Sequence, residues 1–198
     1  MIHYFSMEKS ENSTFLGQQD GEKILATITP HPSVFAFEYT KLIIVSLFLF
    51  IGFFWLKVIS PIFIVIGIPF SLATLIVGFF LYQSIHSKRV AYLTNRRIIR
   101  FEPSNAFVAH SRALTWDNVI KVKTFSSNFF WQVKNIGTVI VHSKTISANG
   151  NDDIMLKNVY YYKDLGNYID KIMYLYANDR PELDKIHPFV NKPKGQRY

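Results

Sequence analysis

The chain has 198 residues, a formal net charge of +8 and no cysteine. The lack of cysteine excludes disulfide bonds, thiolate catalysis and cysteine-based zinc or iron–sulfur sites. Hydrophobic residues make up 49% of the chain and charged residues only 18%, whereas about a quarter is charged in an average soluble protein. The positive excess follows residue 85 and favours an anionic partner such as a lipid surface.

Residues 1–41 form an N-terminal segment in this interpretation. Its first 20 residues contain no basic stretch followed by an apolar stretch, which is the pattern of a cleavable signal peptide. We therefore expect no such peptide, and we expect the opening residues 1–16 to be disordered.

The stretch Leu42–Tyr82 contains one charged residue, Lys57. A single helix of this length would measure ~60 Å, twice the ~30 Å thickness of a bilayer hydrocarbon core. A charge, a small polar residue and a helix-starting proline coincide between Lys57 and Pro61. The sequence therefore predicts a transmembrane hairpin over residues 42–85, with spans at about 42–59 and 61–82.

Positive residues flank this hairpin on one side. Lys41 precedes the first span and five basic residues follow the second, against Lys57 alone in the turn. The positive-inside rule then places both termini in the cytoplasm of a protein that crosses the cell membrane twice.

Small residues recur along the second span at spacings of four, three and four, so they share one helix face. Such a stripe lets two membrane helices approach closely. We expect it to pack against the first span, and self-association of two chains is the alternative. The stripe consists of Gly67, Ser71, Thr74 and Gly78.

The pattern changes at residue 86 to short β-type segments. Strands are predicted at 89–94, 97–102, 107–114, 118–125, 137–143 and 153–159. Apolar residues at helical spacing then predict an amphipathic helix over Lys163–Ala177. We assign residues 86–177 to one β domain and the proline-containing tail, 178–198, to a disordered segment.

Several short segments occur in a characteristic order. They are Gly17-Gln18, Glu22, His31-Pro32, Tyr92–Ile99 (YLTNRRII), Trp116–Val119 with Val122, Asn135–Val141 and Leu156–Val159. Together they resemble the bacterial pleckstrin-homology-like (PH-like) family, in its membrane-anchored members, and Tyr92–Ile99 resembles a β-hairpin of that family.

The resemblance covers about residues 17–176 and implies a PH-like domain without known enzymatic activity. The expected fold class is α+β: a two-helix transmembrane hairpin, then a small barrel or sandwich of about seven antiparallel strands capped by a C-terminal helix. Arg96-Arg97-x-x-Arg100 lacks the alternating basic pattern of phosphoinositide-binding domains, so headgroup specificity is not implied.

Two groups of residues are candidate binding surfaces. The first is a basic set that either docks on anionic lipid or only sets the orientation of the hairpin. The second is an aromatic cluster that either packs in the core or contacts a protein partner or the membrane. The basic set is Lys88, Arg89, Arg96, Arg97 and Arg100, and the aromatic cluster is Phe129, Phe130 and Trp131.

Catalytic and metal-binding patterns are not found in the sequence. The six histidines have no i, i+4 pair, and no nucleophile elbow or glycine-rich phosphate loop occurs. We expect no enzymatic activity, cofactor, metal, small-molecule substrate or nucleic acid. The leading hypothesis is a membrane-anchored adaptor that binds a protein partner, itself or anionic lipid; the alternative is a homo-oligomeric membrane assembly, such as a pore or a transport accessory.

Overall fold

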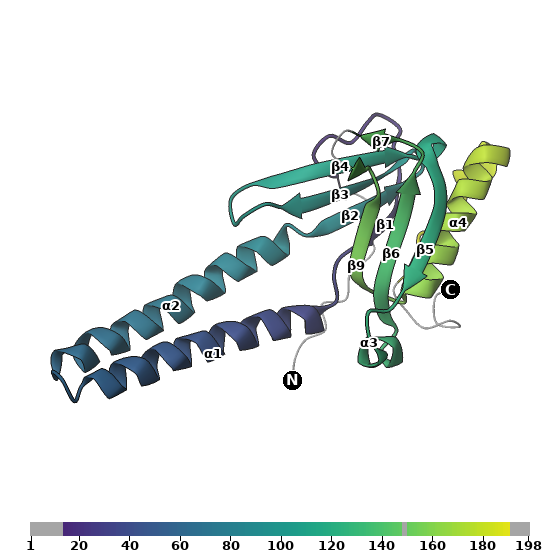
Figure 1. Cartoon of the computed structure of the whole chain (residues 1–198). Helices are drawn as coiled ribbons and strands as arrows, with labels where there is room; N and C mark the ends of the chain where they lie inside the picture. Colours follow the sequence, from purple (N-terminus) through teal and green to yellow (C-terminus); the bar gives the residue numbers. More distant parts are fainter. Residues whose placement is uncertain (1–13, 148–149, 191–198) are drawn as a thin grey trace.

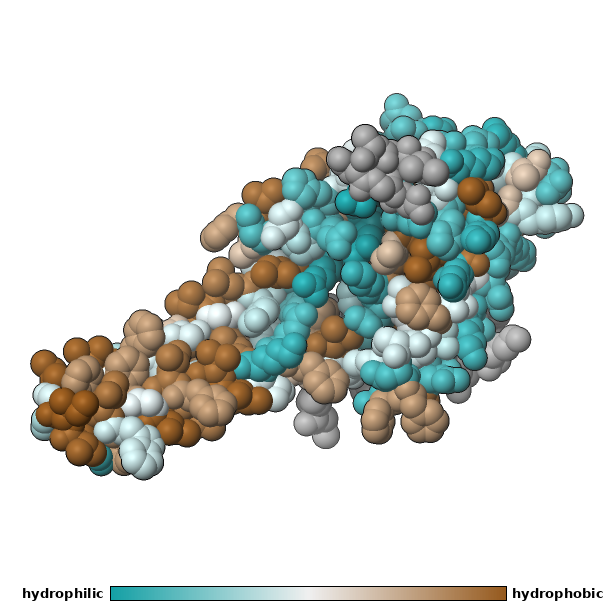
Figure 2. Space-filling model, in the orientation of Figure 1, coloured by the Kyte–Doolittle hydropathy of each residue, from teal (hydrophilic) through white to brown (hydrophobic). Residues whose placement is uncertain are grey.

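A computed structural model of the chain describes residues 14–147 and 150–190. It consists of a long helical hairpin, made of α1 (Pro32–Leu56) and α2 (Ile62–Ser87), that projects from a β domain (Figure 1). The surface of the hairpin is mostly hydrophobic, whereas hydrophilic residues predominate over the β domain (Figure 2). Both helices are long and apolar enough to cross a membrane.

The hairpin turns where the sequence predicts. Helix α1 ends at Leu56 and α2 begins at Ile62, on either side of the predicted break. Helix α1, however, begins ten residues before the expected start of the first span. The reason is local: His31 Nδ1 accepts a hydrogen bond from the Ser33 backbone N–H, and Pro32 supplies the preset φ of a first helical residue.

The small-residue stripe of α2 packs against α1 of the same chain. A Cβ atom added to Gly67 would lie 2.2 Å from Phe53 Cβ, and one added to Gly78 would lie 2.5 Å from Leu42 Cδ1. The Ser46 hydroxyl donates a hydrogen bond of 2.8 Å to the Ser71 carbonyl oxygen across the same interface. The intramolecular packing expected of the stripe is therefore present.

Four antiparallel strands form the first sheet, in the order β1-β2-β3-β4. They are β1 (Ile24–Ile28), β2 (Val90–Thr94), β3 (Arg97–Pro103) and β4 (Ala109–Thr115). Strand β1 was assigned to the N-terminal segment in the sequence analysis, but it pairs with β2, with Ile28 opposite Ala91. The helical hairpin is thus an insertion between two paired strands, and the β domain does not begin at residue 86.

Three antiparallel strands form the second sheet, in the order β5-β6-β9. They are β5 (Val119–Phe125), β6 (Ile136–Ser143) and β9 (Ile154–Tyr160). The 3₁₀ turn η1 (Trp116–Asn118) joins the sheets, the short helix α3 (Phe129–Val133) joins β5 to β6, and β7 (Ile146–Ser147) pairs with β8 (Gly150–Asn151). The predicted strands from 89 to 159 are confirmed to within three residues at each end.

Helix α4 (Tyr162–Asn178) follows the second sheet and matches the predicted amphipathic helix. Its buried face, which includes Leu165, Ile169 and Ile172, packs on a core that both sheets share. Glycine is required at position 137 of β6, because an added Cβ would lie 2.5 Å from Tyr162 Cγ.

The beginning of the tail is ordered, contrary to the disorder expected for residues 178–198. Helix α5 (Arg180–Leu183) follows α4, and Leu183 is buried in the core. Phe189 donates a backbone hydrogen bond of 2.9 Å to the Leu25 carbonyl oxygen of β1. The tail therefore contacts β1, which a reading of local composition does not reveal. Residues 191–198 and most of the expected disordered start, 1–13, lie outside the described residues.

Candidate functional site at the base of the helical hairpin

Short connections join the hairpin to the β domain. Three residues separate β1 from α1, and two residues, Lys88 and Arg89, separate α2 from β2. The His31 backbone N–H donates a hydrogen bond of 2.8 Å to the Asn158 carbonyl oxygen of β9. Because β1 and β2 are themselves paired, both helices are tied to one rigid sheet.

A charged cluster lies between the first turns of α1 and the end of α2. Glu38 Oε1 lies 3.5 Å from an Arg89 guanidinium nitrogen, and Glu38 Oε2 lies 2.9 Å from His86 Nε2, although the latter pair does not have hydrogen-bond geometry. The His86 ring is buried against the Phe35 ring, at a centroid distance of 3.9 Å. The cluster links the two helices where they enter the β domain.

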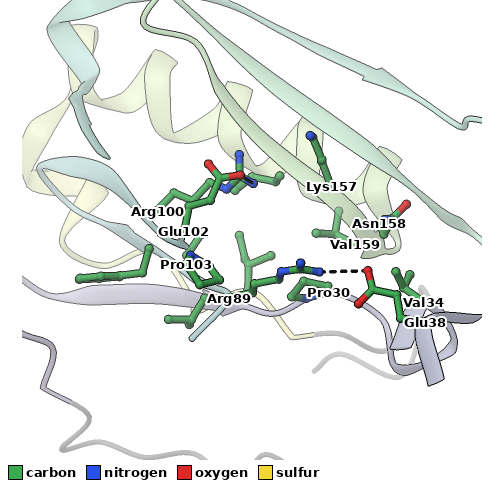
Figure 3. A pocket seen from close by; sticks show the side chains of 15 residues that line it. Pro30, Val34, Glu38, Arg89, Arg100, Glu102, Pro103, Lys157, Asn158 and Val159 are labelled. Atoms are coloured by element: carbon green, nitrogen blue, oxygen red, sulfur yellow. Dashed lines mark hydrogen bonds and ion pairs between the residues drawn. The ribbon is translucent and has the colours of Figure 1, made fainter. Parts of the chain in front are cut away.

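A cavity of about 290 Å³ opens beside this cluster (Figure 3). Its walls come from the end of β1, the start of α1, the start of β2, the end of β3 and the middle of β9. Arg89 points toward Glu38, and Arg100 forms an ion pair of 2.8 Å with Glu102. The charged lining residues are Glu38, Arg89, Arg100, Glu102 and Lys157.

The cavity has a local excess of positive charge around Arg100. Burial lowers the pKa of the Arg100 guanidinium; Glu102 opposes this effect, and the nearby cations Arg112 and Arg89 reinforce it. The side chains of Lys157 and Arg112 are exposed. The two arginines paired with acids are therefore next to further cations, an arrangement that attracts anions.

The predicted basic set is divided between the two ends of the β domain. Lys88, Arg89 and Arg100 lie at the end that joins the hairpin, because Arg100 is opposite Ala91 at the start of β2. Arg96 lies in the turn between β2 and β3, and Arg97 is the first residue of β3, so both lie at the other end of β2. The five residues of β2 extend ~17 Å, which separates these two arginines from Lys88 and Arg89. The odd spacing of Arg97 and Arg100 along β3 directs their side chains to opposite faces of the sheet.

Arg97 has a structural role at that opposite end. Its guanidinium Nε donates a hydrogen bond of 2.9 Å to Glu22 Oε1, and the Thr94 hydroxyl donates one of 2.8 Å to the same oxygen. Burial opposes ionisation of the Glu22 carboxyl, but hydrogen bonds from Arg97, the Gln19 backbone and Thr94 outweigh it and lower its pKa.

Other residues of the matching segments also serve the fold. The Asn95 side-chain oxygen accepts a hydrogen bond from the Lys23 backbone N–H, and the Trp116 indole N–H donates one of 2.9 Å to the Thr94 carbonyl oxygen. The segment Tyr92–Ile99 therefore builds a turn and fixes the N-terminal segment to it.

The predicted aromatic cluster forms helix α3, which is capped by the Asn128 side chain. Phe129 and Phe130 are 72% and 79% exposed, so they are outside the core. Trp131 instead contacts α1, with its ring 5.8 Å from the Phe37 ring in an edge-on arrangement. The cluster is consequently a surface feature beside the base of the hairpin.

A further exposed aromatic residue, Phe107, lies outside the candidate surfaces that the sequence indicates. It lies in the tip between β3 and β4 and is 84% exposed, next to the half-exposed Val108. The tip is fixed to α2, because the Ser84 hydroxyl and the Lys88 ammonium both donate hydrogen bonds to the Ala106 carbonyl oxygen. In the sequence, Phe107 and Val108 are two apolar residues at the start of the strand predicted at 107–114, and this pattern does not distinguish an exposed tip from a buried strand.

The cavity is lined by charged, amide and apolar side chains. Among the described residues that line the cavity, none is Ser, Thr, Cys or His. No group of three or more metal-ligating side chains occurs within residues 14–147 and 150–190. No protein-family model, curated protein or solved structure matches the chain.

Proposed function

We propose that the protein is a non-enzymatic adaptor anchored in the cell membrane. In this proposal the helical hairpin spans the bilayer with both chain termini in the cytoplasm. The β domain is a PH-like domain held at the cytoplasmic face, and its outer surface binds a protein partner.

The observation that carries the proposal is the exposure of apolar residues along the inserted hairpin. Outside the contact between α1 and α2, large side chains such as Phe48 and Phe80 are 71% and 67% exposed. Soluble monomers rarely expose apolar patches of more than a few hundred Å². A bilayer supplies the apolar surroundings that these two helices lack within the chain.

Orientation is supported by charge. Lys41, Lys88 and Arg89 flank the base of the hairpin, and Lys57 is the one cation in its turn. Because cytoplasmic flanks of membrane helices are enriched in Lys and Arg, the base and the attached β domain are assigned to the cytoplasmic side.

A binding role is supported by the fold and by an exposed strand. Two antiparallel sheets, of four and three strands, followed by a C-terminal helix agree in strand number with the fold that the resemblance to PH-like domains implies, although β1 precedes the hairpin. Among the described residues β4 pairs with β3 alone, and of its seven side chains just Leu114 is buried. We assign the protein contact to this open edge, where a partner strand could add main-chain hydrogen bonds.

Site-specific photo-crosslinking in cells tests the adaptor role. A photoreactive residue replaces Ser111, on the exposed part of β4, and in a matched control it replaces Lys163, which is exposed on α4. We expect a crosslinked heterologous protein from position 111 that is weak or absent from position 163.

Two results would contradict the proposal. A product at twice the mass of the chain from position 111 would indicate self-association through β4. Equal products from both positions, or none from position 111, would remove the evidence for a partner at this edge.

A further inference from the structure

We propose that two separate groups of apolar side chains, called apolar points below, insert from the β domain into the lipid surface, one on each side of the hairpin. Together they form an apolar collar, which consists of Phe107, Val108, Phe129, Phe130 and Val133. The inference rests on the proposed membrane anchoring, and its partner is the interfacial layer of a phospholipid bilayer.

The first point is the β3–β4 tip. Phe107 is 84% exposed, and the Ala106 carbonyl oxygen next to it accepts hydrogen bonds from Ser84 and Lys88 of the α2 end. The tip therefore has a fixed position beside α2, although Phe107 is almost fully exposed and Val108 is half exposed.

The second point is α3. Phe129, Phe130 and Val133 are 72%, 79% and 67% exposed, while Trp131 between them holds the helix against Phe37 of α1. An aromatic side chain at a membrane surface is typical, because the layer between headgroups and acyl chains accommodates large rings.

The two points lie on opposite sides of the hairpin. His86 is buried against α1, whereas Ser84, two residues earlier and ~200° around the helix, faces away and bonds to the tip. Likewise Tyr39 contacts Phe79 of α2, and Phe37 faces away toward α3. Figure 1 shows the tip of β3 and β4 beside α2, and α3 separately beyond α1.

The height of both points matches the lipid interface. At 1.5 Å per residue, Ser84 lies ~3 Å and Lys88 ~9 Å beyond Tyr82, the end of the second apolar span. On the other helix, Phe37 lies ~8 Å before Leu42, the start of the first. The polar layer of each leaflet is ~5–8 Å thick, so the Ser84 contact lies within this layer and the Phe37 contact lies at its outer limit.

Charge around the collar suits an anionic lipid surface. Lys88 bonds to the tip, and Lys41 is exposed on α1, one helical turn after Phe37. Lys134, which directly follows α3, is exposed; burial and then the charge of Lys134 lower the pKa of His31 at the start of α1. Exposed aromatic residues bordered by cations are the composition of interfacial membrane contacts.

Fluorescence quenching in vesicles tests the inference on the full chain. Because the protein has no cysteine, single substitutions Phe107→Cys and Phe130→Cys can each be labelled with the fluorophore bimane. Two reference positions receive the same label: Phe48→Cys on the exposed face of α1, and Thr115→Cys at the end of β4 away from the hairpin. The proteins are reconstituted in vesicles of phosphatidylethanolamine and phosphatidylglycerol, and they are quenched with aqueous iodide or with a nitroxide-bearing lipid.

We expect the labels at 107 and 130 to be quenched by the nitroxide lipid and protected from iodide, with emission at shorter wavelength than at 115. If the label at position 48 is quenched by the nitroxide lipid but the label at 107 or 130 is quenched by iodide as the label at 115 is, the proposed collar is wrong while the membrane anchor stands. If instead the label at position 107 or 130 is quenched by labels on other copies, so that mixing with unlabelled protein restores its fluorescence, a second copy covers the collar and lipid contact is excluded. Iodide quenching at 48 would contradict the anchor itself.

Discussion

The Glu22 carboxylate has no exposed side-chain surface, yet it carries a charge and fixes the N-terminal segment to the β2–β3 turn. Its pKa is lowered because hydrogen bonds from Arg97, Gln19 and Thr94 outweigh the effect of burial. A carboxyl group with a lowered folded-state pKa stabilises the fold above its unfolded-state pKa and loses that contribution as pH falls through the folded-state value. The free energy of unfolding should therefore decrease below about pH 5.

The substitution Glu22→Gln tests this residue. Removing one partner of a buried ion pair leaves Arg97 without its counter-charge, and the expected loss is about 3 kcal/mol of unfolding free energy at pH 7. Unfolding followed by circular dichroism at pH 7 and pH 4 should also show a weaker acid effect in the variant.

A matched control is Asp117→Asn, which removes the charged partner of Arg180 in a pair whose side chains are 66% and 65% exposed. An exposed ion pair contributes about 0–1 kcal/mol, so this variant should unfold almost as the parent does. Equal losses for both substitutions would contradict a special role for Glu22.

At the scale of elements, the contact between α1 and α2 depends on glycine. An added side chain at Gly67 would overlap Phe53, whereas one at Gly52 would meet no atom within 4 Å. We expect Gly67→Leu to weaken the helix pair by about 1–3 kcal/mol and Gly52→Leu to leave it intact.

Disulfide formation between Ser46→Cys and Ser71→Cys measures this contact, since Ser46 already bonds to the Ser71 backbone. The intrachain disulfide should form in the double-cysteine variant alone and in its combination with Gly52→Leu, and it should form less in the combination with Gly67→Leu. If Gly67→Leu left the disulfide unchanged but converted an oligomer to monomers, the stripe would serve self-association.

Strand β1 is a second element on which the β domain depends. Leu25, Ala26 and Ile28 are buried in the core, and loss of each large aliphatic side chain costs about 2–5 kcal/mol. We expect a chain with residues 32–87 replaced by a Gly-Ser linker to fold in water. A chain that starts at Lys88 should aggregate, as judged by size-exclusion chromatography; equal behaviour of the two would contradict the role of β1.

Sequence pattern predicted those elements whose signal is local. The hairpin turn, six strands and α4 each have their own periodicity or breaker residues, such as Pro61. Strand β1 was missed although Ile24–Ile28 is β-like, because its partner β2 lies more than 60 residues later. Likewise the contact of Phe189 with β1 has no local signal.

For the candidate site, sequence proximity was misleading. Arg97 and Arg100 are three residues apart, but this odd spacing on an extended strand directs their side chains to opposite faces of the sheet. Glu38 and Lys157 line the cavity together, although more than 100 residues separate them. Only the folded arrangement of the two sheets around the hairpin base brings such residues together.

At the scale of the whole molecule, the insertion of the hairpin between paired strands couples the anchor to the domain. Connections of two and three residues leave little freedom for the β domain to move away from the helix ends. The account therefore requires the base of the hairpin, β4 and the apolar collar to lie on one side of the membrane.

Single-cysteine labelling of the otherwise cysteine-free chain tests this claim most directly. Lys57→Cys in the hairpin turn and Lys163→Cys on α4 are exposed to a membrane-impermeant maleimide in intact right-side-out vesicles. The account predicts that position 57 is labelled and that position 163 reacts only after the membrane is opened. Labelling of position 163 in sealed vesicles, or protection of position 57 in them, would contradict it.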